Sequence, residues 1–542
     1  MKRRVTSLLI ALIVILSSVS TATFAYAYGV NTTANQKSIK GSKSIEQKSV
    51  CLTVGSDENS RNITWYAKTM MPGTVQYAPK STMVGNAFPA KYREAKAISR
   101  LSNDTGFYTN QATMDELKAN TEYVYRFVNG EQISKTYTFK TGDVSKGIRF
   151  AVVGDPQIGS GDLEAGIAGW EVALNAIQTK LNVDFLISAG DQVNTSSSEI
   201  EYAGFLNERL ASLALAPTIG NHDNSSTAYG QHFNIPNESA IYGRTLAGAN
   251  YWYVYGNTLF MHINSNSMST IGHEAFLKNA IEKNPDAKWK IVVFHHSIYS
   301  TAGHWDDPDI ISRRNSLPPI LNKLGIDVVF MGHDHIYTRS YMMNGTTPDS
   351  VKGPQSEVVA PTGVLYITGN SGSGSKYYGV AENFDADYAA KIDQSKRPTA
   401  IEVSITDTEY TMTTYFTDDM SVLDKFTIRK TANINDPVVD NPNTDEETTG
   451  NNGSTNNTNG NSNGNTSTNN NADTGVTVND KTPQSGQSVA DKTLQSGSTV
   501  KDKIANTGDV SEVIVISVFA MASIVTAVAA FNRKKILSSE EN

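Results

Sequence analysis

Hydrophobic and polar residues alternate with a period of two along residues 49–143. The alternation is clearest in four short segments, residues 62–66, 74–77, 122–127 and 136–139. This period is typical of strands that bury one face, and no long helical pattern interrupts it. We predict a small β-sandwich of about seven strands. It contains no histidine, so its expected role is to pack against the next domain, and binding of a ligand or a cell wall is the alternative.

The pattern changes between residues 147 and 431, where short apolar runs alternate with longer amphipathic stretches. The short runs predict buried strands, and helices are expected at residues 163–180, 199–213, 273–283 and 309–324. This alternation indicates a layered α/β architecture. The predicted fold class is therefore a layered α/β domain preceded by an all-β sandwich domain.

A further apolar run marks the start of the chain. Residues 1–27 combine three basic residues, an apolar run at residues 8–16 and small residues that end in Ala25-Tyr26-Ala27. Together these features predict a secretory signal peptide that is cut after Ala27. The alternative is an uncleaved membrane anchor.

Another apolar run lies near the end of the chain, at residues 513–531. It has no charged residue, is long enough to cross a bilayer and is followed by three basic residues. With the preceding Ile-Ala-Asn-Thr-Gly at 504–508, residues 504–542 resemble the sortase sorting signal of Gram-positive surface proteins, although Ile504 replaces leucine and Ala505 replaces proline. The resemblance implies cleavage after Thr507 and linkage to peptidoglycan, and a plain transmembrane helix is the alternative. Either anchor predicts an extracellular, cell-surface protein of a Gram-positive-type bacterium.

The segment between the folded part and this anchor, residues 433–503, has low complexity. Residues 450–471 consist only of Asn, Gly, Ser and Thr. Such a stretch buries too little apolar surface to offset the loss of chain entropy on folding. We therefore predict a disordered spacer.

Composition narrows the possible classes. A chain of 542 residues is long enough for two or three domains. Its single cysteine, Cys51, rules out an intramolecular disulfide framework. The formal charge of −8 falls to −11 without the three basic residues of the predicted signal peptide. An acidic chain gives no support for binding nucleic acid through a basic surface, and no nucleic-acid partner is expected.

Candidate chemistry is concentrated in five short polar stretches of the second domain. They follow apolar runs at residues 148–153, 183–189, 214–219, 290–294 and 328–331, and read Gly154-Asp155-Pro156-Gln157, Gly190-Asp191, Gly220-Asn221-His222-Asp223, His295-His296 and Gly332-His333-Asp334-His335. Ligands usually bind at the carboxyl ends of strands in an α/β sheet. Carboxylate, amide oxygen and imidazole together suit two divalent or mixed-valence metal ions.

These motifs, in this order, resemble the metallophosphoesterase (calcineurin-like) superfamily. The preceding β-sandwich makes the purple acid phosphatase branch the nearest resemblance, over residues 49–431. The resemblance implies β-sheets sandwiched between helices and a dinuclear metal centre. The implied metal ligands are Asp155, Asp191, Asn221, His295, His333 and His335. Asp191 would bridge both metals, and Asp155 and His335 would bind the first while the others bind the second.

The resemblance also implies roles around the metals. His222 would act as general acid toward the leaving oxygen, and Asp223 would orient His222. His296 and His304 would contact the phosphate.

The chain departs from the family pattern at two positions. The purple enzymes have Gly-Asp-x-x-Tyr, and its tyrosinate binds ferric iron and gives the colour, but Asn194 stands at that position here. Gln157 stands where the wider superfamily often has histidine. An oxygen of Gln157 or Asn194, or a water, would complete the shell of the first metal. The metal pair stays open among iron, manganese and zinc, and magnesium is also compatible.

A glycine-rich segment at residues 369–374 follows another apolar run but lacks the spacing and lysine of a nucleotide-binding P-loop. We predict a flexible loop there, with a place at the rim of the site as the alternative.

The resulting hypothesis is a cell-surface metal-dependent phosphatase that hydrolyses phosphomonoesters by attack of metal-bound hydroxide. Its partners would be a phosphate-ester substrate and either peptidoglycan or the membrane. A phosphodiesterase or nucleotide-cleaving enzyme with the same centre is the nearest alternative. A wall-binding protein with a vestigial centre is the third.

Overall fold

The computed structural model describes residues 46–349 and 356–430, which belong to a compact unit that spans Met1–Asn441. A second unit, Pro442–Asn542, lies outside the described residues. The predicted signal peptide, spacer and sorting signal, at residues 1–27, 433–503 and 504–542, also lie outside them. Within the described ranges, no helix has both the length and the apolar character needed to span a membrane.

Residues 46–141 form an all-β domain. Its elements are β1 (Gln47–Val54), β2 (Arg61–Ala67), β3 (Thr74–Pro79), the 3-10 turn η1 (Lys80–Thr82), β4 (Arg93–Lys96), β5 (Ile98–Leu101), β6 (Tyr108–Met114), β7 (Glu122–Asn129), β8 (Gln132–Ile133) and β9 (Tyr137–Lys140). One sheet has the order β1-β2-β6-β5 and the other β4-β3-β7-β8, with β9 beside β7. The buried Trp65 ring of the first sheet stacks on Phe127 of the second, with 4.9 Å between centroids. The predicted all-β domain is thus confirmed.

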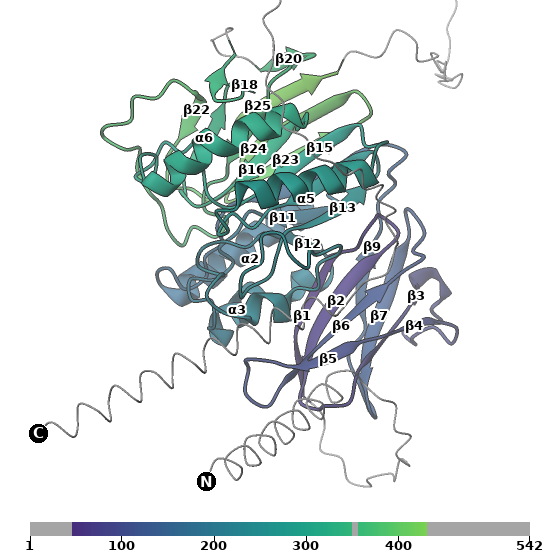
Figure 1. Ribbon diagram of the computed structural model, residues 1–542. Coiled ribbons are helices and arrows are strands. Elements are labelled where there is room, and N and C mark those ends of the chain that lie inside the picture. Colours follow the sequence, from purple (N-terminus) through teal and green to yellow (C-terminus); the bar gives the residue numbers. More distant parts are fainter. Residues whose placement is uncertain (1–45, 350–355, 431–542) are drawn as a thin grey trace, which may run out of the picture. The chain divides into compact units, whose positions relative to one another are not determined.

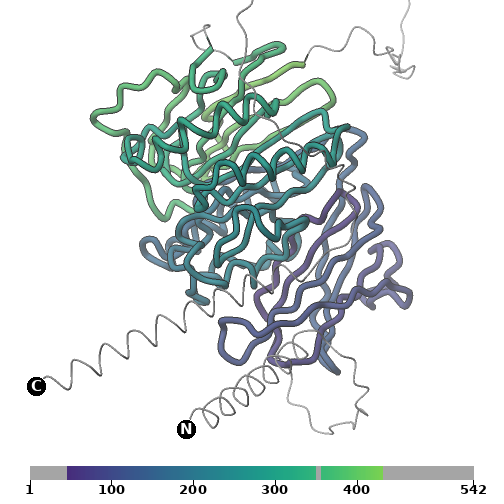
Figure 2. Tube along the Cα trace, in the orientation of Figure 1, coloured from purple at the N-terminus to yellow at the C-terminus, as the bar shows by residue number. Residues whose placement is uncertain are grey.

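The all-β domain is joined to the next domain through a shared sheet. Strand β1 pairs in parallel with β12 (Ala214–Pro217), where Thr53 lies opposite Leu215. The combined sheet has the order β20-β25-β24-β23-β10-β11-β12-β1-β2-β6-β5, and the chain trace in Figure 2 can be followed across it. A hydrogen bond from the Tyr125 hydroxyl to the Ala211 carbonyl, 2.6 Å long, reinforces the junction. The two domains therefore form a continuous structure.

Two sheets face each other in the second domain. The first contains β10 (Ile148–Val153), β11 (Phe185–Ser188), β12, β20 (Glu357–Val359), β23 (Thr399–Ile405), β24 (Glu409–Phe416) and β25 (Val422–Arg429). The second contains β13 (Tyr251–Tyr255), β14 (Thr258–His262), β15 (Trp289–Val293), β16 (Val328–Met331), β17 (Tyr337–Ser340), β21 (Leu365–Thr368) and β22 (Ala389–Asp393); β18 (Met343–Asn344) and β19 (Thr347–Pro348) form a separate hairpin. Between the sheets, the buried Phe150 ring packs edge-on against Phe260 and Phe330.

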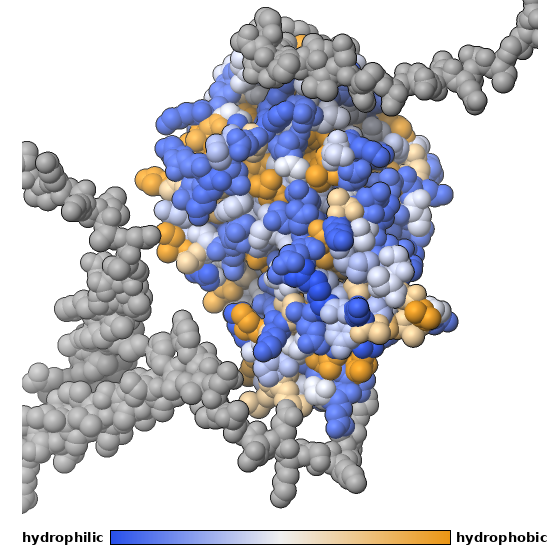
Figure 3. All heavy atoms as spheres, turned by 90° about the vertical axis from the view of Figure 1, so that its right-hand side faces the viewer, coloured by the Kyte–Doolittle hydropathy of each residue, from blue (hydrophilic) through white to orange (hydrophobic). Residues whose placement is uncertain are grey.

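Helices cover the outer faces of both sheets. Helices α2 (Leu163–Lys180), α3 (Glu199–Phe205) and α4 (Ala228–His232) pack on the first sheet through a core that includes Trp170 and Val153. Helices α5 (Thr270–Lys283) and α6 (Pro308–Lys323) pack on the second through Leu277 and Leu321. Figure 1 shows these two helices on the same side of the second sheet. The order helix, sheet, sheet, helix confirms the predicted layered α/β domain. The face in Figure 3 is mainly hydrophilic with scattered apolar groups, because the large apolar side chains lie between the layers.

One predicted helix is shorter than expected. The sequence pattern predicts a helix at residues 199–213, but α3 ends at Phe205 and a 3-10 turn, η2 (Glu208–Ala211), follows. Asn207 separates the two, because its side chain accepts a hydrogen bond from the Arg209 backbone and caps the second turn. Such capping competes with continuation of the helix.

Candidate metal centre

The five polar stretches meet at one edge of the two facing sheets. Asp155, Asp191 and Asn221 follow β10, β11 and β12, which are parallel neighbours in the first sheet. His295 and His333 follow β15 and β16, which are parallel neighbours in the second. Because parallel strands end at the same edge, their C-terminal loops lie together. The fold therefore gathers residues that are up to 180 positions apart in the chain.

Glycines precede the ligand motifs because no β-carbon would fit there. A β-carbon at Gly190 would lie 2.3 Å from Nδ1 of His295, and one at Gly220 would lie 2.0 Å from Oδ1 of Asp191. Real β-carbons essentially never approach other atoms within 3.0 Å. The glycines in these motifs thus allow neighbouring strand ends to come close enough for their polar side chains to converge.

Three of the predicted ligands have a left-handed backbone conformation. The φ angles of Asp191, His333 and His335 are +47°, +77° and +44°. Such conformations cost about 1–3 kcal/mol each for a residue other than glycine, and they cluster at functional sites. The conformation at His333 is held in part by its backbone N–H, which lies 2.9 and 2.8 Å from the two carboxylate oxygens of Asp155. The surrounding strands therefore hold these three residues in strained backbone conformations, and these conformations direct their side chains toward the site.

The residues predicted to bind the second metal converge on one point. Oδ1 of Asn221 lies 2.9 Å from Nε2 of His295 and 3.0 Å from Nδ1 of His333. The two ring nitrogens are 3.2 Å apart, and Nε2 of His295 is 3.3 Å from Oδ2 of Asp191. Four potential donor atoms from four strand ends are thus close enough to surround one cation.

The residues predicted to bind the first metal lie beside this group. Nε2 of His335 is 3.7 Å from Oδ1 of Asp155, and Nδ1 of His295 is 3.8 Å from the same oxygen. Ligand atoms of Asp155, Asp191 and His295 all lie within 4.8 Å of one another. The buried carboxylate of Asp191 is therefore placed between the two groups, where a bridging ligand would be needed.

Backbone carbonyls orient two of the imidazoles. Nδ1 of His295 donates to the carbonyl of Ala189 at 3.0 Å, and Nδ1 of His335 donates to the carbonyl of Lys376 at 2.9 Å. A ring that donates from Nδ1 keeps its Nε2 lone pair for a metal, and such outer contacts are a regular feature of metal sites. These two bonds fix Nε2 as the coordinating atom of both residues.

The charges at the site favour the protonation states that metal binding requires at His333 and Asp191, whereas His295 must give up a proton when a cation binds. Burial lowers the pKa of His333 well below its usual value, and the neighbouring His295 lowers it further. Burial acts to raise the pKa of Asp191, but His295 outweighs it and lowers the pKa. For His295, burial acts to lower the pKa, but Asp191 and Asp155 outweigh it and raise the pKa to about 9. The negative charge that attracts a proton to His295 is charge that a bound cation would neutralise.

The structure corrects the role expected for Asp223. The predicted contact with His222 is absent: Oδ1 of Asp223 accepts from the Gln192 backbone at 3.1 Å, and Oδ2 accepts from the Gly220 backbone at 2.8 Å. Instead, Nδ1 of His222 donates to the carbonyl of Asn194 at 2.7 Å. Asp223 is fully buried and ties the loops after β11 and β12 together. The expected contact is not made because the Asp223 carboxylate and the His222 ring are each bonded to other backbone groups.

The two predicted phosphate contacts, His296 and His304, flank the ring of His333. Their ring centroids are 4.8 and 4.6 Å from that of His333. Nδ1 of His296 is 2.8 Å from the Ser265 hydroxyl, and Nδ1 of His304 is 2.6 Å from Oδ1 of the buried Asp334. The hydrogen bond to Asp334 raises the pKa of His304. Both imidazoles are thus held beside the candidate metal ligands.

Comparisons with known proteins match both domains. Residues 148–337 match the calcineurin-like phosphoesterase family, and residues 47–141 match the N-terminal domain of purple acid phosphatases. The chain therefore contains a calcineurin-like phosphoesterase domain, which follows a purple acid phosphatase N-terminal domain. All the candidate ligands, from Asp155 to His335, lie within the range that matches the phosphoesterase family.

Individual relatives of this metallophosphoesterase are distant. It is 28% identical to probable purple acid phosphatase 20 of Arabidopsis thaliana over 250 residues, which are 42% of this chain and 55% of the relative. It is 27% identical to purple acid phosphatase 21 of the same plant over 316 residues, which are 55% of this chain and 66% of the relative. The chain thus spans between half and two thirds of the length of these relatives.

A solved structure supports the fold assignment. Purple acid phosphatase PPD1 from yellow lupin (Lupinus luteus) seeds superposes with a TM-score of 0.58 at 15% identity, covering 71% of this chain and 74% of that chain. At this identity the likeness shows the fold alone. It agrees with an all-β domain followed by a layered α/β domain.

The donor set of the metallophosphoesterase fits a pair of cations. Carboxylate, amide and imidazole donors converge in two adjoining groups that share Asp191, as described above. The side-chain oxygen Oε1 of Gln157 is buried and has no hydrogen-bond partner among the described residues. A buried acceptor without a partner is costly unless a cation or a water satisfies it. The site is therefore consistent with a dinuclear metal centre.

The glycine-rich segment at residues 369–374 has a different role from the flexible loop expected from the sequence. Asn370 and Ser371 are fully buried. The backbone N–H of Gly372 and the hydroxyl of Ser371 donate to the carbonyl of Asp155, at 3.2 and 3.1 Å. The segment packs behind the first ligand motif and holds its backbone. Its glycines are needed because a β-carbon at Gly369 or Gly372 would lie 2.8 Å from the backbone of Gly154.

Other residues at the site gave little or no signal in the sequence. The Lys376 carbonyl, which orients His335, could not be predicted because any residue supplies a carbonyl. The ring of Tyr378 lies 5.1 Å from that of His304 and 5.4 Å from that of His335. Asp334 could have been singled out, because a buried acid between two ligand histidines is a natural partner for a third imidazole.

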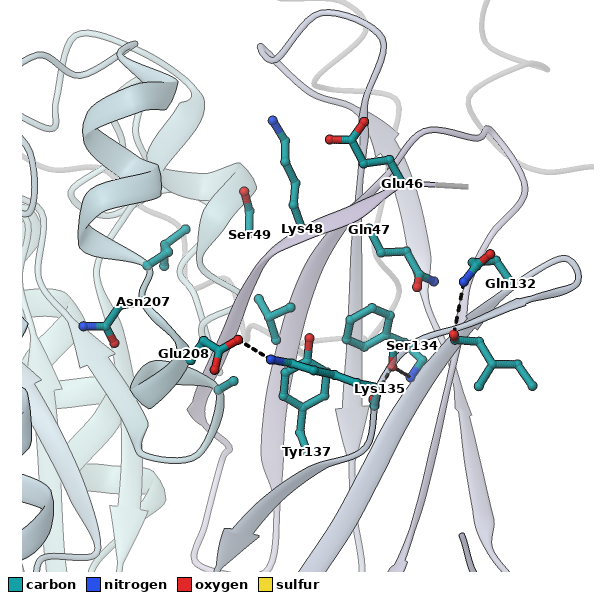
Figure 4. Close-up of a pocket in the computed structure, with 15 residues that line it drawn as sticks. Glu46, Gln47, Lys48, Ser49, Gln132, Ser134, Lys135, Tyr137, Asn207 and Glu208 are labelled. Carbon is teal, nitrogen blue, oxygen red and sulfur yellow. Dashed lines mark hydrogen bonds and ion pairs between the residues drawn. The ribbon is translucent and has the colours of Figure 1, made fainter. Parts of the chain in front are cut away.

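A separate cleft of about 590 Å³ lies between the all-β domain and η2 (Figure 4). It is lined by side chains such as Gln47, Ser134 and Asn207, and an ion pair between Lys135 and Glu208 crosses it. It contains none of the candidate metal ligands. The volume of a cleft therefore does not identify the metal centre. The convergence of donor atoms identifies it.

Proposed function

We propose that this protein is a cell-surface metal-dependent phosphatase that hydrolyses phosphomonoesters. The observation that carries the proposal is the convergence of Asp155, Asp191, Asn221, His295, His333 and His335 from five strand ends. The match of this region to the phosphoesterase family supports it, and so does the purple acid phosphatase name of the relatives.

The protein's own groups have separate tasks in this mechanism. When bound, two cations would supply an activated water and neutralise charge on the phosphoryl oxygens. His222 would deliver a proton to the leaving oxygen from Nε2, because its Nδ1 is committed to the Asn194 carbonyl. His304 would donate from Nε2 to a phosphoryl oxygen, because its Nδ1 is committed to Asp334. The raised pKa of His304 keeps this ring protonated, and therefore a better donor to an anion, over a wider pH range.

The activity is tested with the purified full chain, an aryl phosphomonoester and the corresponding diester. We expect about two metal ions per chain after dialysis against Mn²⁺ or Zn²⁺, and faster turnover of the monoester. In Asp191→Asn, the loss of the shared ligand should abolish turnover and reduce the metal content. Faster turnover of the diester would favour a phosphodiesterase. Failure to bind metal and to turn over either substrate would leave a wall-binding role with a vestigial centre.

We further propose that the protein is exported and anchored at the cell surface through residues 1–27 and 504–542. The support is the sequence pattern described above: a basic and apolar start that ends in Ala25-Tyr26-Ala27, and the Ile-Ala-Asn-Thr-Gly pentapeptide before an apolar run. Mass spectrometry of the protein from its native cells tests both ends. We expect a mature N-terminus at Tyr28. We also expect a C-terminal peptide that is released by a muramidase, in which Thr507 is the last residue of the chain and carries a peptidoglycan fragment. An intact C-terminus in the detergent-soluble fraction would identify a transmembrane anchor instead.

A further inference from the structure

The first metal position has fewer secure protein ligands than the second. Asp155, Asp191 and His335 supply three donor atoms. The resemblance leaves two further candidates for this position, Gln157 and Asn194, which stand where the resembling families have histidine and tyrosine. From the sequence alone, either amide or a water could complete the shell. The hydrogen bonds of the two amides separate these choices.

Gln157 is held rigidly beside the bridging ligand. Its backbone N–H donates to the carbonyl of Asp191 at 2.7 Å, and the next residue, Ile158, pairs with Val193 in a parallel bridge. The Asn194 backbone N–H closes this bridge by donating to the Ile158 carbonyl at 2.9 Å. Gln157 has a φ of +34° and is 1% exposed. The loop after β10 is therefore attached to the loop after β11, with the Gln157 side chain buried beside them.

The side-chain contacts of the two amides differ. Nε2 of Gln157 donates to Oδ1 of Asn194 at 3.2 Å. This bond uses one lone pair of the Asn194 oxygen and leaves Oε1 of Gln157 buried with no hydrogen-bond partner among the described residues. Asn194 is also only half-buried, so water can reach its remaining polar atoms. Gln157 therefore presents the unpartnered oxygen, and Asn194 fixes its orientation.

A second buried glutamine provides a comparison. Oε1 of Gln192 also lacks a partner among the residues described. Its Nε2, however, donates to the Ser188 hydroxyl and the Thr218 carbonyl, both at 3.1 Å. Ser188 ends β11 and Thr218 follows β12, so this side chain lies against the strands that support the site. Gln192 has the same chemistry and burial as Gln157 but is anchored to the sheet.

We propose that Oε1 of Gln157 is a ligand of the first metal and that Asn194 is its positioning residue. This inference rests on the proposed dinuclear centre. It gives the first position two carboxylates, one imidazole and one neutral amide oxygen, where a tyrosinate would have added a negative charge. Oxygen-rich sites of this kind suit Mn²⁺ and Mg²⁺. The position therefore selects a divalent cation over ferric iron, and the centre is colourless and insensitive to reduction.

The test measures metal binding directly, with the full chain and the metal alone. Wild type, Gln157→Ala, Asn194→Ala and Gln192→Ala are dialysed against graded Mn²⁺, and bound metal is measured by mass spectrometry. We expect two sites in wild type and in Gln192→Ala. In Gln157→Ala, the affinity of one site should fall at least tenfold while the other is unchanged. Asn194→Ala should weaken the same site to a smaller extent, because the ligand remains but its orientation is lost.

A spectroscopic readout separates ligation from a structural role. Co²⁺ is bound in place of Mn²⁺, and its visible absorption, which depends on the coordinating atoms, is compared across the variants. Altered spectra in Gln157→Ala and Asn194→Ala, with wild-type spectra in Gln192→Ala, are expected. The melting temperature of each variant, measured with a chelator present so that no metal is bound, checks that the variant is folded. Gln157→Glu keeps an oxygen donor and should retain both sites, which guards against a misfolded alanine variant.

The outcomes distinguish this inference from the function on which it rests. If wild type binds two ions and Gln157→Ala binds both with unchanged affinity and an unchanged Co²⁺ spectrum, the ligand assignment is wrong and the dinuclear centre stands. If wild type binds no metal, the proposed function itself fails. A ferric ion retained by wild type through dialysis, with visible colour, would overturn the predicted selectivity.

Discussion

Replacing Gly220 by alanine should disable the metal centre while the protein stays folded. A β-carbon at this position would lie 2.0 Å from Oδ1 of Asp191 and 2.2 Å from its backbone nitrogen. Rotation of the Asp191 side chain relieves the first clash but not the second. Moving the nitrogen from 2.2 Å to the 3.0 Å limit requires a shift of at least 0.8 Å. The Asp191 backbone cannot yield freely, because its carbonyl is held by the Gln157 N–H at 2.7 Å.

The size of the effect follows from this shift. A misplacement of about 1 Å in a catalytic group costs about 100-fold in rate, and at 1.36 kcal/mol for each factor of ten this is about 2.7 kcal/mol of transition-state stabilisation. Overpacking should cost a further ~1–3 kcal/mol of folding stability. Because the shift displaces the shared ligand, the affinity for both metals should fall together with kcat.

The matched control is Gly303→Ala, at a loop position where an added β-carbon meets no atom within 4 Å. Gly303 directly precedes His304, so the control probes the same region of the molecule. Metal content, kcat/KM on an aryl phosphate and the melting temperature are measured for both variants. Gly303→Ala should match wild type in all three. If Gly220→Ala also retains two metals and kcat/KM within threefold of wild type, the close approach of the loop after β12 to Asp191 does not position the bridging ligand.

Three further predictions concern His222, His262 and Asn194. His222→Ala should lower kcat by about 10²–10⁴-fold on an alkyl phosphate, and much less on an aryl phosphate, whose leaving group needs no proton. The metal content should be unchanged. Equal losses on both substrates would contradict the general-acid role. His262 is fully buried, and burial lowers its pKa to about 3. Between pH 6.5 and 3 the unfolded chain therefore binds a proton that the folded chain does not bind. The free energy of unfolding falls as the pH falls through this range. At pH 5 the free energy of unfolding should be about 2 kcal/mol lower than at pH 7 because of this residue. Urea unfolding at the two pH values should show a smaller difference in His262→Gln than in wild type. An equal difference in both proteins would show that His262 does not set this acid sensitivity. Asn194→Tyr loaded with ferric iron should gain visible absorption that wild type lacks. The reason is that the side chain at 194 already contacts Gln157 beside the first metal position. An uncoloured variant with two bound metals would show that this side chain does not reach the metal.

Local patterns in the sequence were sufficient to predict the fold class and to place the candidate ligands after apolar runs. The period of two before residue 143 and the alternation after residue 147 predicted the all-β domain and the layered α/β domain. Within each sheet the polar stretches could be placed together from the chain alone, because parallel strands end at the same edge of a sheet. Only the structure shows that they come from two sheets that face each other. For Asp155 and Asp191, a strand, a glycine and a carboxylate in succession are local features that any reader of the chain can find.

The tertiary structure decided the features that depend on contacts between distant segments. Whether Gln157 or Asn194 has a free oxygen depends on a hydrogen bond across 37 residues. The burial of the segment at 369–374 depends on the carbonyl of Asp155, more than 200 residues earlier. The sharing of one sheet by both domains depends on the parallel pairing of β1 with β12. Periodicity reports only which face of an element is buried. It carries no information about which distant group will satisfy a given hydrogen-bonding atom, and that choice is made when the chain packs.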